Sequence, residues 1–189
     1  MLCQILNKGI KIMTEKYYSE VKAAKEIVSG LCKKYPDVFW AITNPDIVMV
    51  LGIENKERGK KNKTLAKIKS VKAEEKTILR ENNIPVRYII TLYYSDWNEW
   101  NEKKKQWIIF HELLHIHHEV GKLIKHDISD WKILVDKVGV SWIDSDTLPD
   151  LLNDEVKFNF ADSGEFENPN WKYIGHKLSD EKIMELLKI

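Results

Sequence analysis

The sequence predicts an α+β fold, with a small sheet, one central helix and a second helix that follows it. Two short apolar segments, 47–53 and 86–94, have the length and β-branched content of buried strands. Segments with helical spacing of apolar residues precede and follow these strands instead of alternating with them. The order helix, strand, strand, helix, helix is typical of α+β proteins and not of alternating parallel-sheet proteins.

The first helix is predicted over residues 14–34. Its apolar residues recur at the spacing of one helix face, namely at Tyr17, Val21, Ala24, Val28 and Leu31. Pro36 discourages the helix from continuing, because proline lacks the backbone N–H that a helix interior needs. The strand 47–53 comes next, and the strand 86–94 is bounded by Pro85 before it.

The stretch Glu54–Glu81 between the two strands is rich in lysine. It holds ten Lys or Arg and five Asp or Glu, a net charge of +5. We interpret it as a solvated loop with an exposed helix. The alternative is a phosphate-contacting surface, which clustered lysines can supply. The stretch has no aromatic residue on which bases could stack.

A central helix is predicted to begin after Asn98 or Asn101, either of which can cap it, and to run to Glu119 before Gly121. A further helix is predicted from Ile128 to Val138, closed by Gly139.

The C-terminal part carries weaker patterns. A turn entering a short helix is expected at 148–152, and a terminal helix with Ser179 as its cap at 179–188. We divide the chain into a domain at 14–152 and an extension at 153–189 that packs on it.

Composition excludes several classes of protein. A chain of 189 residues with a net charge of +1 fits one globular domain and not a polyanion binder along its whole length. Two cysteines are too few for a disulfide framework. The sequence has neither a convincing signal peptide nor an apolar run of membrane-spanning length, so we expect a cytoplasmic protein.

The residues that carry chemistry are His111, Glu112 and His115, which form an H-E-x-x-H motif inside the predicted central helix. Histidines four residues apart lie on one helix face, so both can bind a single Zn²⁺. The glutamate lies beside the metal, where it can accept a proton from a zinc-activated water. The alternative is a buried helix whose histidines are incidental. We favour it less because of the apolar residues that surround the motif.

Catalytic zinc usually has three protein ligands, so a third must come from elsewhere. His118 lies about 10.5 Å along the helix axis from His111, too far for one metal, and is expected at the surface or behind the ligands. His126 follows the predicted helix end and can return to the metal. Asp127 is an alternative ligand, although it also suits a cap for the next helix.

The runs H-E-L-L-H-I at 111–116, K-L-I-K-H-D-I-S-D-W at 122–131 and V-G-V-S-W at 138–142 resemble the putative phage metallopeptidase family, a group of zincins. The resemblance implies a zincin-like fold with His111, His115 and His126 as zinc ligands and Glu112 as the catalytic base. A weaker likeness is to SprT-like zincins, which act on DNA-bound proteins. This chain lacks the zinc-ribbon cysteines that often accompany them.

We therefore expect a zinc metallopeptidase that hydrolyses peptide bonds in a peptide or protein substrate. The strand 86–94 is expected to offer its free edge to the substrate. Tyr93, Tyr94 and His118 are candidates to stabilise the oxyanion. The alternative from another class is a nucleic-acid-associated protein with a structural zinc site. The sequence predicts no oligomeric state.

Overall fold

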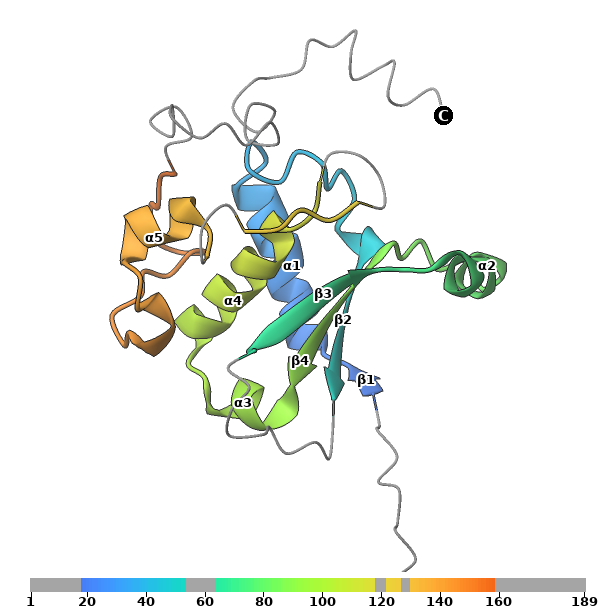
Figure 1. Ribbon diagram of the computed structural model, residues 1–189, viewed down its shortest axis with the longest axis horizontal. Helices are drawn as coiled ribbons and strands as arrows, with labels where there is room; N and C mark the ends of the chain where they lie inside the picture. Colours follow the sequence, from blue (N-terminus) through green and yellow to red (C-terminus); the bar gives the residue numbers. More distant parts are fainter. Residues whose placement is uncertain (1–17, 54–63, 118–121, 127–129, 159–189) are drawn as a thin grey trace, which may run out of the picture.

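The computed structural model describes residues 18–53, 64–117, 122–126 and 130–158 (Figure 1). The strands in these ranges are β1 (Tyr18–Glu20), β2 (Val48–Ile53), β3 (Ala66–Ser70) and β4 (Tyr88–Tyr93). The α-helices are α1 (Lys22–Lys34), α2 (Ala73–Glu81), α3 (Tyr94–Glu99), α4 (Glu102–Leu114) and α5 (Lys132–Val138). Two 3₁₀ turns lie at Pro45–Ile47 and Trp142–Asp144. The fold is α+β, as predicted.

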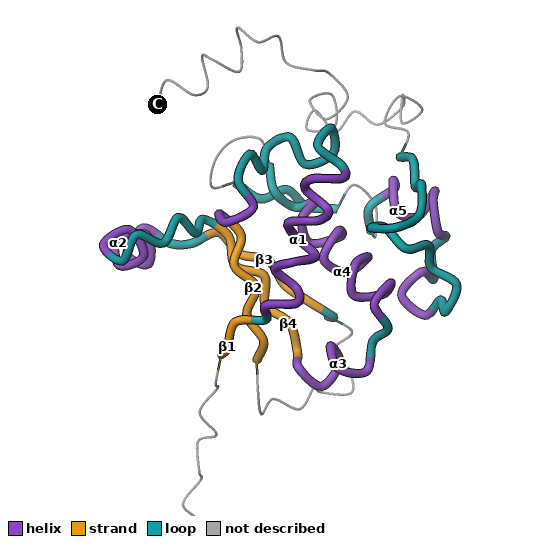
Figure 2. The backbone as a smooth tube through the Cα atoms, turned by 180° about the vertical axis from the view of Figure 1, so that it is seen from behind, coloured by secondary structure: helices purple, strands orange, loops and turns teal. Residues whose placement is uncertain are grey.

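The four strands form one mixed sheet in the order β1-β2-β4-β3. β2 and β4 are parallel, whereas β1 and β3 run antiparallel to their neighbours β2 and β4. Helices α1 and α4 lie together on one face of this sheet, as both backbone views show (Figures 1 and 2). The order makes β4 an interior strand and β3 an edge strand.

The core lies between the sheet and these two helices. Alternate residues of the central strands face the helices and are buried, because side chains on a strand point to opposite faces in turn. They are Val48 and Val50 of β2 and Tyr88, Ile90 and Leu92 of β4. Helix α4 contributes eight buried residues, which makes it the most deeply packed helix of the described residues.

Helix α1 buries the face that the sequence predicted, through Ala24, Val28 and Leu31. Its predicted start was wrong, however. Residues 18–20 form β1, which pairs with β2 through the register Tyr18↔Ile53. An unpaired edge of β2 is thereby covered, and this pairing overrides the local helical pattern. Residues 14–17 lie outside the described residues.

The Lys-rich stretch contains more structure than predicted. The expected exposed helix is present as α2, which has no buried residue. Residues 66–70, expected to be a loop, form the edge strand β3 instead. Ala66 and Ile68 face the core while Lys67 is exposed, so the strand has the alternating pattern of a half-buried strand.

Helix α4 begins with Asn101 as its cap, whose side-chain oxygen accepts a hydrogen bond from the Lys104 N–H at 2.8 Å. Asn98 lies within α3 and is not the cap. The predicted end at Glu119 was also wrong. Helix α4 ends at Leu114, and His115 is its C-cap.

Helix α5 starts at Lys132 and not at Ile128, with Trp131 at the N-cap position. Gly139 closes it as predicted, with a φ of 85° that favours glycine. The short helix expected at 148–152 is absent. Residues 148–150 have no regular secondary structure, and a turn follows at 151–153. Leu148 and Leu151 are nevertheless buried in the core.

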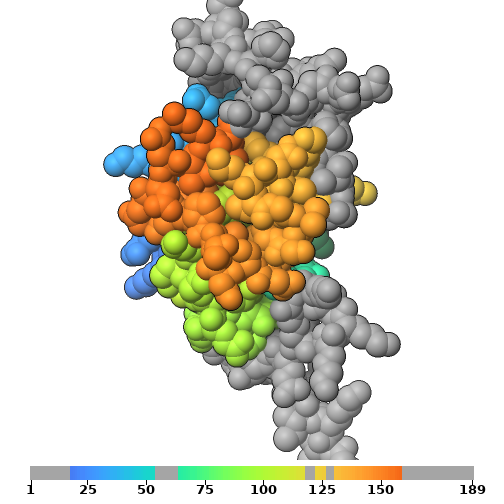
Figure 3. Space-filling view, turned by 90° about the vertical axis from the view of Figure 1, so that its left-hand side faces the viewer, coloured from blue at the N-terminus to red at the C-terminus, as the bar shows by residue number. Residues whose placement is uncertain are grey.

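The segment 130–158 covers the central part of one side of the molecule (Figure 3). Within the described ranges, no helix is long and apolar enough to cross a membrane. The predicted helix at 179–188 lies outside the described residues, and the division into a domain and an extension stays a prediction.

Candidate metal centre

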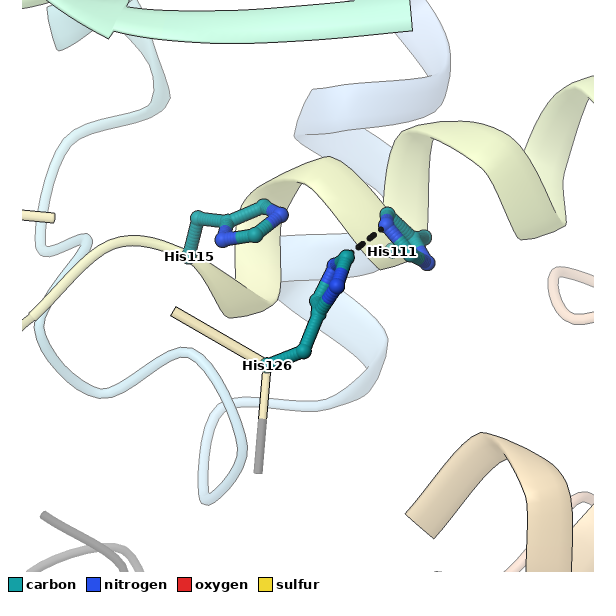
Figure 4. A group of neighbouring side chains, drawn as sticks. All are labelled: His111, His115 and His126. Atoms are coloured by element: carbon teal, nitrogen blue, oxygen red, sulfur yellow. Dashed lines mark hydrogen bonds between the residues drawn. The ribbon is translucent and has the colours of Figure 1, made fainter. Parts of the chain in front are cut away.

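Three histidines from two segments meet beside the end of α4. His111 and His115 project from the same face of α4, and His126 reaches them from the segment that follows (Figure 4). The Nε2 atoms of His111 and His126 are 3.0 Å apart. One ring nitrogen from each of the three lies within 4.8 Å of the others, so together they can hold one metal ion.

The backbone after α4 brings His126 to this position. Ile116 and Leu123 form an isolated antiparallel bridge. The backbone N–H of Ile124 donates to the carbonyl oxygen of His115 at 2.8 Å, and that of His117 donates to the Lys122 carbonyl at 3.2 Å. The chain therefore returns alongside the end of the helix, which places residue 126 next to residues 111 and 115.

His115 is held in a form suited to binding a metal. Its Nδ1 lies 2.7 Å from the carbonyl oxygen of Ile124, which can only accept a hydrogen bond. The proton therefore resides on Nδ1, and the lone pair of Nε2 is available. Burial lowers the pKa of His115 to about 4, so the imidazole is neutral near pH 7.

Asp130 is the carboxylate behind His111. Its Oδ1 lies 3.0 Å from His111 Nδ1. The contact does not have the geometry of a hydrogen bond, so it is mainly electrostatic. Asp130 also accepts hydrogen bonds from the Trp131 backbone and from Trp142 Nε1, both at 2.7 Å. Burial alone would raise the pKa of Asp130, but these contacts together lower it to about 2.

Trp131 packs against all three histidines. Its ring centroid is 6.4 Å from that of His111, 4.9 Å from that of His115 and 5.1 Å from that of His126. The side chain is fully buried, and its Nε1 donates to the carbonyl oxygen of His111 at 3.1 Å. The indole thus fixes the position of the rings relative to one another.

Glu112 lies beside the histidines and is 6% exposed. Burial raises the pKa of its carboxyl to about 7, while His111 and a hydrogen bond from the backbone of Ile68 act in the opposite direction. A bound cation would lower this raised pKa, because it favours the charged carboxylate. Glu112 is therefore a proton acceptor whose basicity lies near the range useful at neutral pH.

The histidines and Glu112 open into a cleft of about 880 Å³. Residues 64–68, which include the first three residues of β3, form one wall, and the segment 123–126 forms another. The hydrogen bond between Ile68 and Glu112 shows that backbone groups of β3 point into this cleft. The predicted substrate strand was wrong, because β4 is paired on both sides and has no free edge.

The residues fit a transition metal with borderline-soft character. Three imidazole nitrogens are the donor set that zinc, copper, iron and nickel accept. A tetrahedral zinc ion places its nitrogen ligands roughly 3.4 Å apart, given Zn–N distances of about 2.0–2.1 Å. The three nitrogens already lie within 4.8 Å of one another, so small rotations of the rings suffice.

A family model described as putative phage metallopeptidase matches residues 16–157. The chain belongs to this family. Comparisons with curated proteins and with solved structures find no match. The match to the putative phage metallopeptidase family spans the sheet, α4, the three histidines and the cleft.

Within this family member, some predicted site residues lie elsewhere. Tyr93 and Tyr94 do not line the cleft. Tyr94 packs against Gly52 instead, where an added Cβ would lie 2.1 Å from its ring. His118 and Asp127 lie outside the described residues. The N-cap of α5 is Trp131, so the capping role expected for Asp127 was wrong.

Sequence reasoning missed Asp130 and β3 as parts of the site. Asp130 is the second aspartate of the run H-D-I-S-D-W at 126–131. The indication available in the sequence was that Asp130 stands directly before Trp131, in the same short run as the predicted ligand His126. For β3, the alternation of Ala66, Lys67, Ile68 and Lys69 indicated a strand with one buried face.

Proposed function

We propose that the chain is a zinc-dependent metallopeptidase that hydrolyses peptide bonds. The observation that carries the proposal is the meeting of His111, His115 and His126 within 4.8 Å, with Glu112 in the same cleft. The family description, putative phage metallopeptidase, supports the reaction class.

Zinc is favoured by the number and kind of donors. Catalytic zinc sites commonly combine three protein ligands with one open position. Here the described residues bring together three imidazoles, and the site faces a cleft and not the protein interior. A structural zinc site would need a fourth protein ligand and a closed shell. The open arrangement therefore favours catalysis over the structural alternative.

When bound, zinc supplies Lewis acidity, which polarises the scissile carbonyl and lowers the pKa of a water to about 7. Glu112 accepts the proton of the attacking water and passes it to the leaving amine. Its buried position limits competing solvent, and its hydrogen bond with Ile68 orients the carboxylate. Asp130 and Trp131 hold His111 in place during these steps.

We assign substrate binding to the free edge of β3. An extended peptide can pair with an exposed strand edge through main-chain hydrogen bonds. β3 is an edge strand of the described sheet and lines the cleft through residues 66–68. A peptide paired there would pass over the histidines, because Ile68 of this strand reaches Glu112.

The test is a Glu112→Gln variant assayed on a peptide library, with zinc content measured by elemental analysis. Glu112→Gln should keep about one zinc per chain and lose hydrolysis, since the amide keeps the size of the side chain but accepts no proton. Glu102→Gln is the matched control, because Glu102 is an exposed glutamate in the first turn of the same helix. Equal cleavage by Glu112→Gln and wild type would refute the role of Glu112.

Cleavage of DNA-bound proteins, as in SprT-like zincins, and nucleic-acid binding through 54–81 stay predictions. Within that stretch, residues 66–70 form β3 and residues 73–81 form α2. Binding through phosphate contacts would weaken steeply with salt. A salt titration of DNA binding between 50 and 200 mM therefore tests the alternative.

A further inference from the structure

We propose that the cleft selects peptides with acidic side chains close to the scissile bond, through Lys67 and Lys125. This inference rests on the proposed peptidase function and adds a substrate class to it. The two lysines line the same cleft from two different segments. Lys67 is adjacent in sequence to Ile68, which contacts Glu112, and Lys125 is adjacent to His126.

Lys67 precedes Ile68, whose backbone is hydrogen-bonded to Glu112. Consecutive Cα atoms are about 3.8 Å apart, so the Lys67 backbone lies close to the proposed base. The side chain of Ile68 packs on the core, and neighbouring side chains of a strand point to opposite faces. Lys67 therefore points away from the core and is exposed, beside the edge to which a peptide would pair.

Lys125 lies between two residues fixed at the metal centre. The backbone of Ile124 exchanges hydrogen bonds with His115, through its N–H at 2.8 Å and its carbonyl oxygen at 2.7 Å. His126 on the other side is a proposed ligand. The ammonium of Lys125 is thus carried by an anchored backbone, and its side chain is exposed at the cleft.

The other charges that line the cleft are already engaged. Glu112 is buried and bonded to Ile68, and Asp130 is bound by His111, Trp131 and Trp142. In the described part of the chain, Lys67 and Lys125 form no ion pair. Most of the remaining wall is apolar, including Leu65, Ile108, Leu123 and Ile143. A peptide in the cleft therefore meets apolar walls and two lysines that form no ion pair with the described residues.

Lys69 provides a matched control on the same strand. It lies on the same face of β3 as Lys67, two residues along. Its ammonium is paired with the Glu75 carboxylate at 2.7 Å, and Lys69 does not line the cleft. Loss of Lys69 removes the same charge from the chain without changing the charge that faces a peptide.

The experiment measures binding, so that it does not depend on cleavage. Three fluorescein-labelled peptides of one apolar sequence carry Glu, Gln or Lys at the two positions flanking the central residue. Fluorescence anisotropy is recorded with the full chain carrying Glu112→Gln, in the presence of zinc. The Glu peptide should bind most tightly, and its advantage should shrink as salt rises, because exposed charges are screened.

Lys67→Gln and Lys125→Gln, each in that background, should weaken binding of the Glu peptide by about two- to fivefold, the range of an exposed charge pair. The double replacement by Glu should reverse the preference towards the Lys peptide. Lys69→Gln should leave it unchanged.

Any of three binding results would overturn the inference. The first is equal binding of the three peptides, and the second is no binding of any of them at 50 mM salt. The third is a loss with Lys69→Gln as large as with Lys67→Gln. If the wild type cuts no peptide but the charge preference is present, the peptidase proposal fails and the cleft is an acidic-peptide binding site. If the wild type cuts all three peptides equally, hydrolysis stands and the selection does not.

Discussion

Helices α4 and α2 are both associated with β3, yet they are stabilised in opposite ways. α4 packs in the centre of the molecule and buries eight of its 13 residues. α2 follows β3 directly, projects from the body and buries none of its nine residues (Figure 1). Ile78 of α2 is 62% exposed, whereas Trp107, Ile109 and Phe110 of α4 are fully buried.

The two helices also differ in the range of the interactions that hold them. In α2 they are local: Glu75 accepts from the Lys72 backbone N–H at 2.8 Å, and the Asn82 side chain donates to the Ile78 carbonyl at 2.8 Å. In α4 they are long-range, for example Trp107 Nε1 donating to the Pro149 carbonyl at 2.9 Å. Long-range packing is thus concentrated on the helix that carries His111 and Glu112. Substitutions around α4 should therefore be costly and those in α2 mild.

The largest effect is expected for Trp131→Ala. Removing a fully buried indole should lower the free energy of unfolding of the metal-free protein by about 3–5 kcal/mol. Ile78→Ala in α2 is the matched case and should cost less than about 0.5 kcal/mol, because its side chain is exposed. Urea unfolding followed by circular dichroism measures both. Trp131 packs on α4 through its bond to the His111 carbonyl. Similar losses in the two variants would therefore break the contrast between the packing around α4 and that of α2.

His126→Ala should lower zinc affinity by more than the 10–100-fold typical of residues that act through a ligand, above about 2.7 kcal/mol. The reason is the loss of one of three imidazoles within 4.8 Å. Lys76→Ala in α2 should leave affinity unchanged. Competition titration with a chelating dye gives the constants. If His126→Ala binds zinc like wild type and Asp127→Ala loses zinc affinity, the third zinc ligand is Asp127 and not His126.

Asp130→Asn should lower zinc affinity by about 10–100-fold while the protein stays folded. The amide keeps the shape of the side chain but loses the negative charge 3.0 Å from His111 Nδ1. Asp136→Asn is a suitable control, since Asp136 is an exposed aspartate on the nearby helix α5. The same dye titration applies, and an affinity equal to that of wild type would show that the charge of Asp130 does not act on His111.

Tyr35→Phe should cost about 1 kcal/mol of unfolding free energy, since the Tyr35 hydroxyl donates to the Leu151 carbonyl at 2.8 Å. Burial, and then the charges of Asp150 and Asp154, raise the pKa of Tyr35 to about 12. The folded pKa exceeds the unfolded value of about 10. This contribution is therefore fully present below pH 10 and is lost as the pH rises towards 12. Between pH 10 and pH 12, urea titrations should show a larger fall in the free energy of unfolding for wild type than for Tyr35→Phe. Parallel curves of this free energy against pH would contradict the assignment.

Glu75→Gln should have the smallest effect, at most about 0.5 kcal/mol, because its ion pair with Lys69 is exposed. Thermal melts in low and high salt should converge as the ion pair is screened. A larger loss would mean that α2 contributes to the stability of the whole fold and would weaken the contrast with α4.

The same contrast explains which features the sequence could predict. The motif His111-Glu112-x-x-His115 and the buried strands β2 and β4 have local patterns, and the structure places them together. The end of α4 at Leu114 was not predictable locally, because it depends on the bridge between Ile116 and Leu123. β1 likewise depends on pairing with β2, a contact between segments about thirty residues apart. Asp130 acquires its position only when Trp142 folds onto it.

The bridge between Ile116 and Leu123 has a thermodynamic consequence for metal loading. All three histidines fall between residues 111 and 126, so a bound ion closes only a short loop of chain. The bridge and the bond from Ile124 N–H to His115 already close that loop through the backbone. Most of the loop-closure entropy is thus lost on folding and not on metal uptake. The metal-free protein should therefore take up and release its ion without unfolding, with the amide of Ile124 protected from hydrogen exchange in both states.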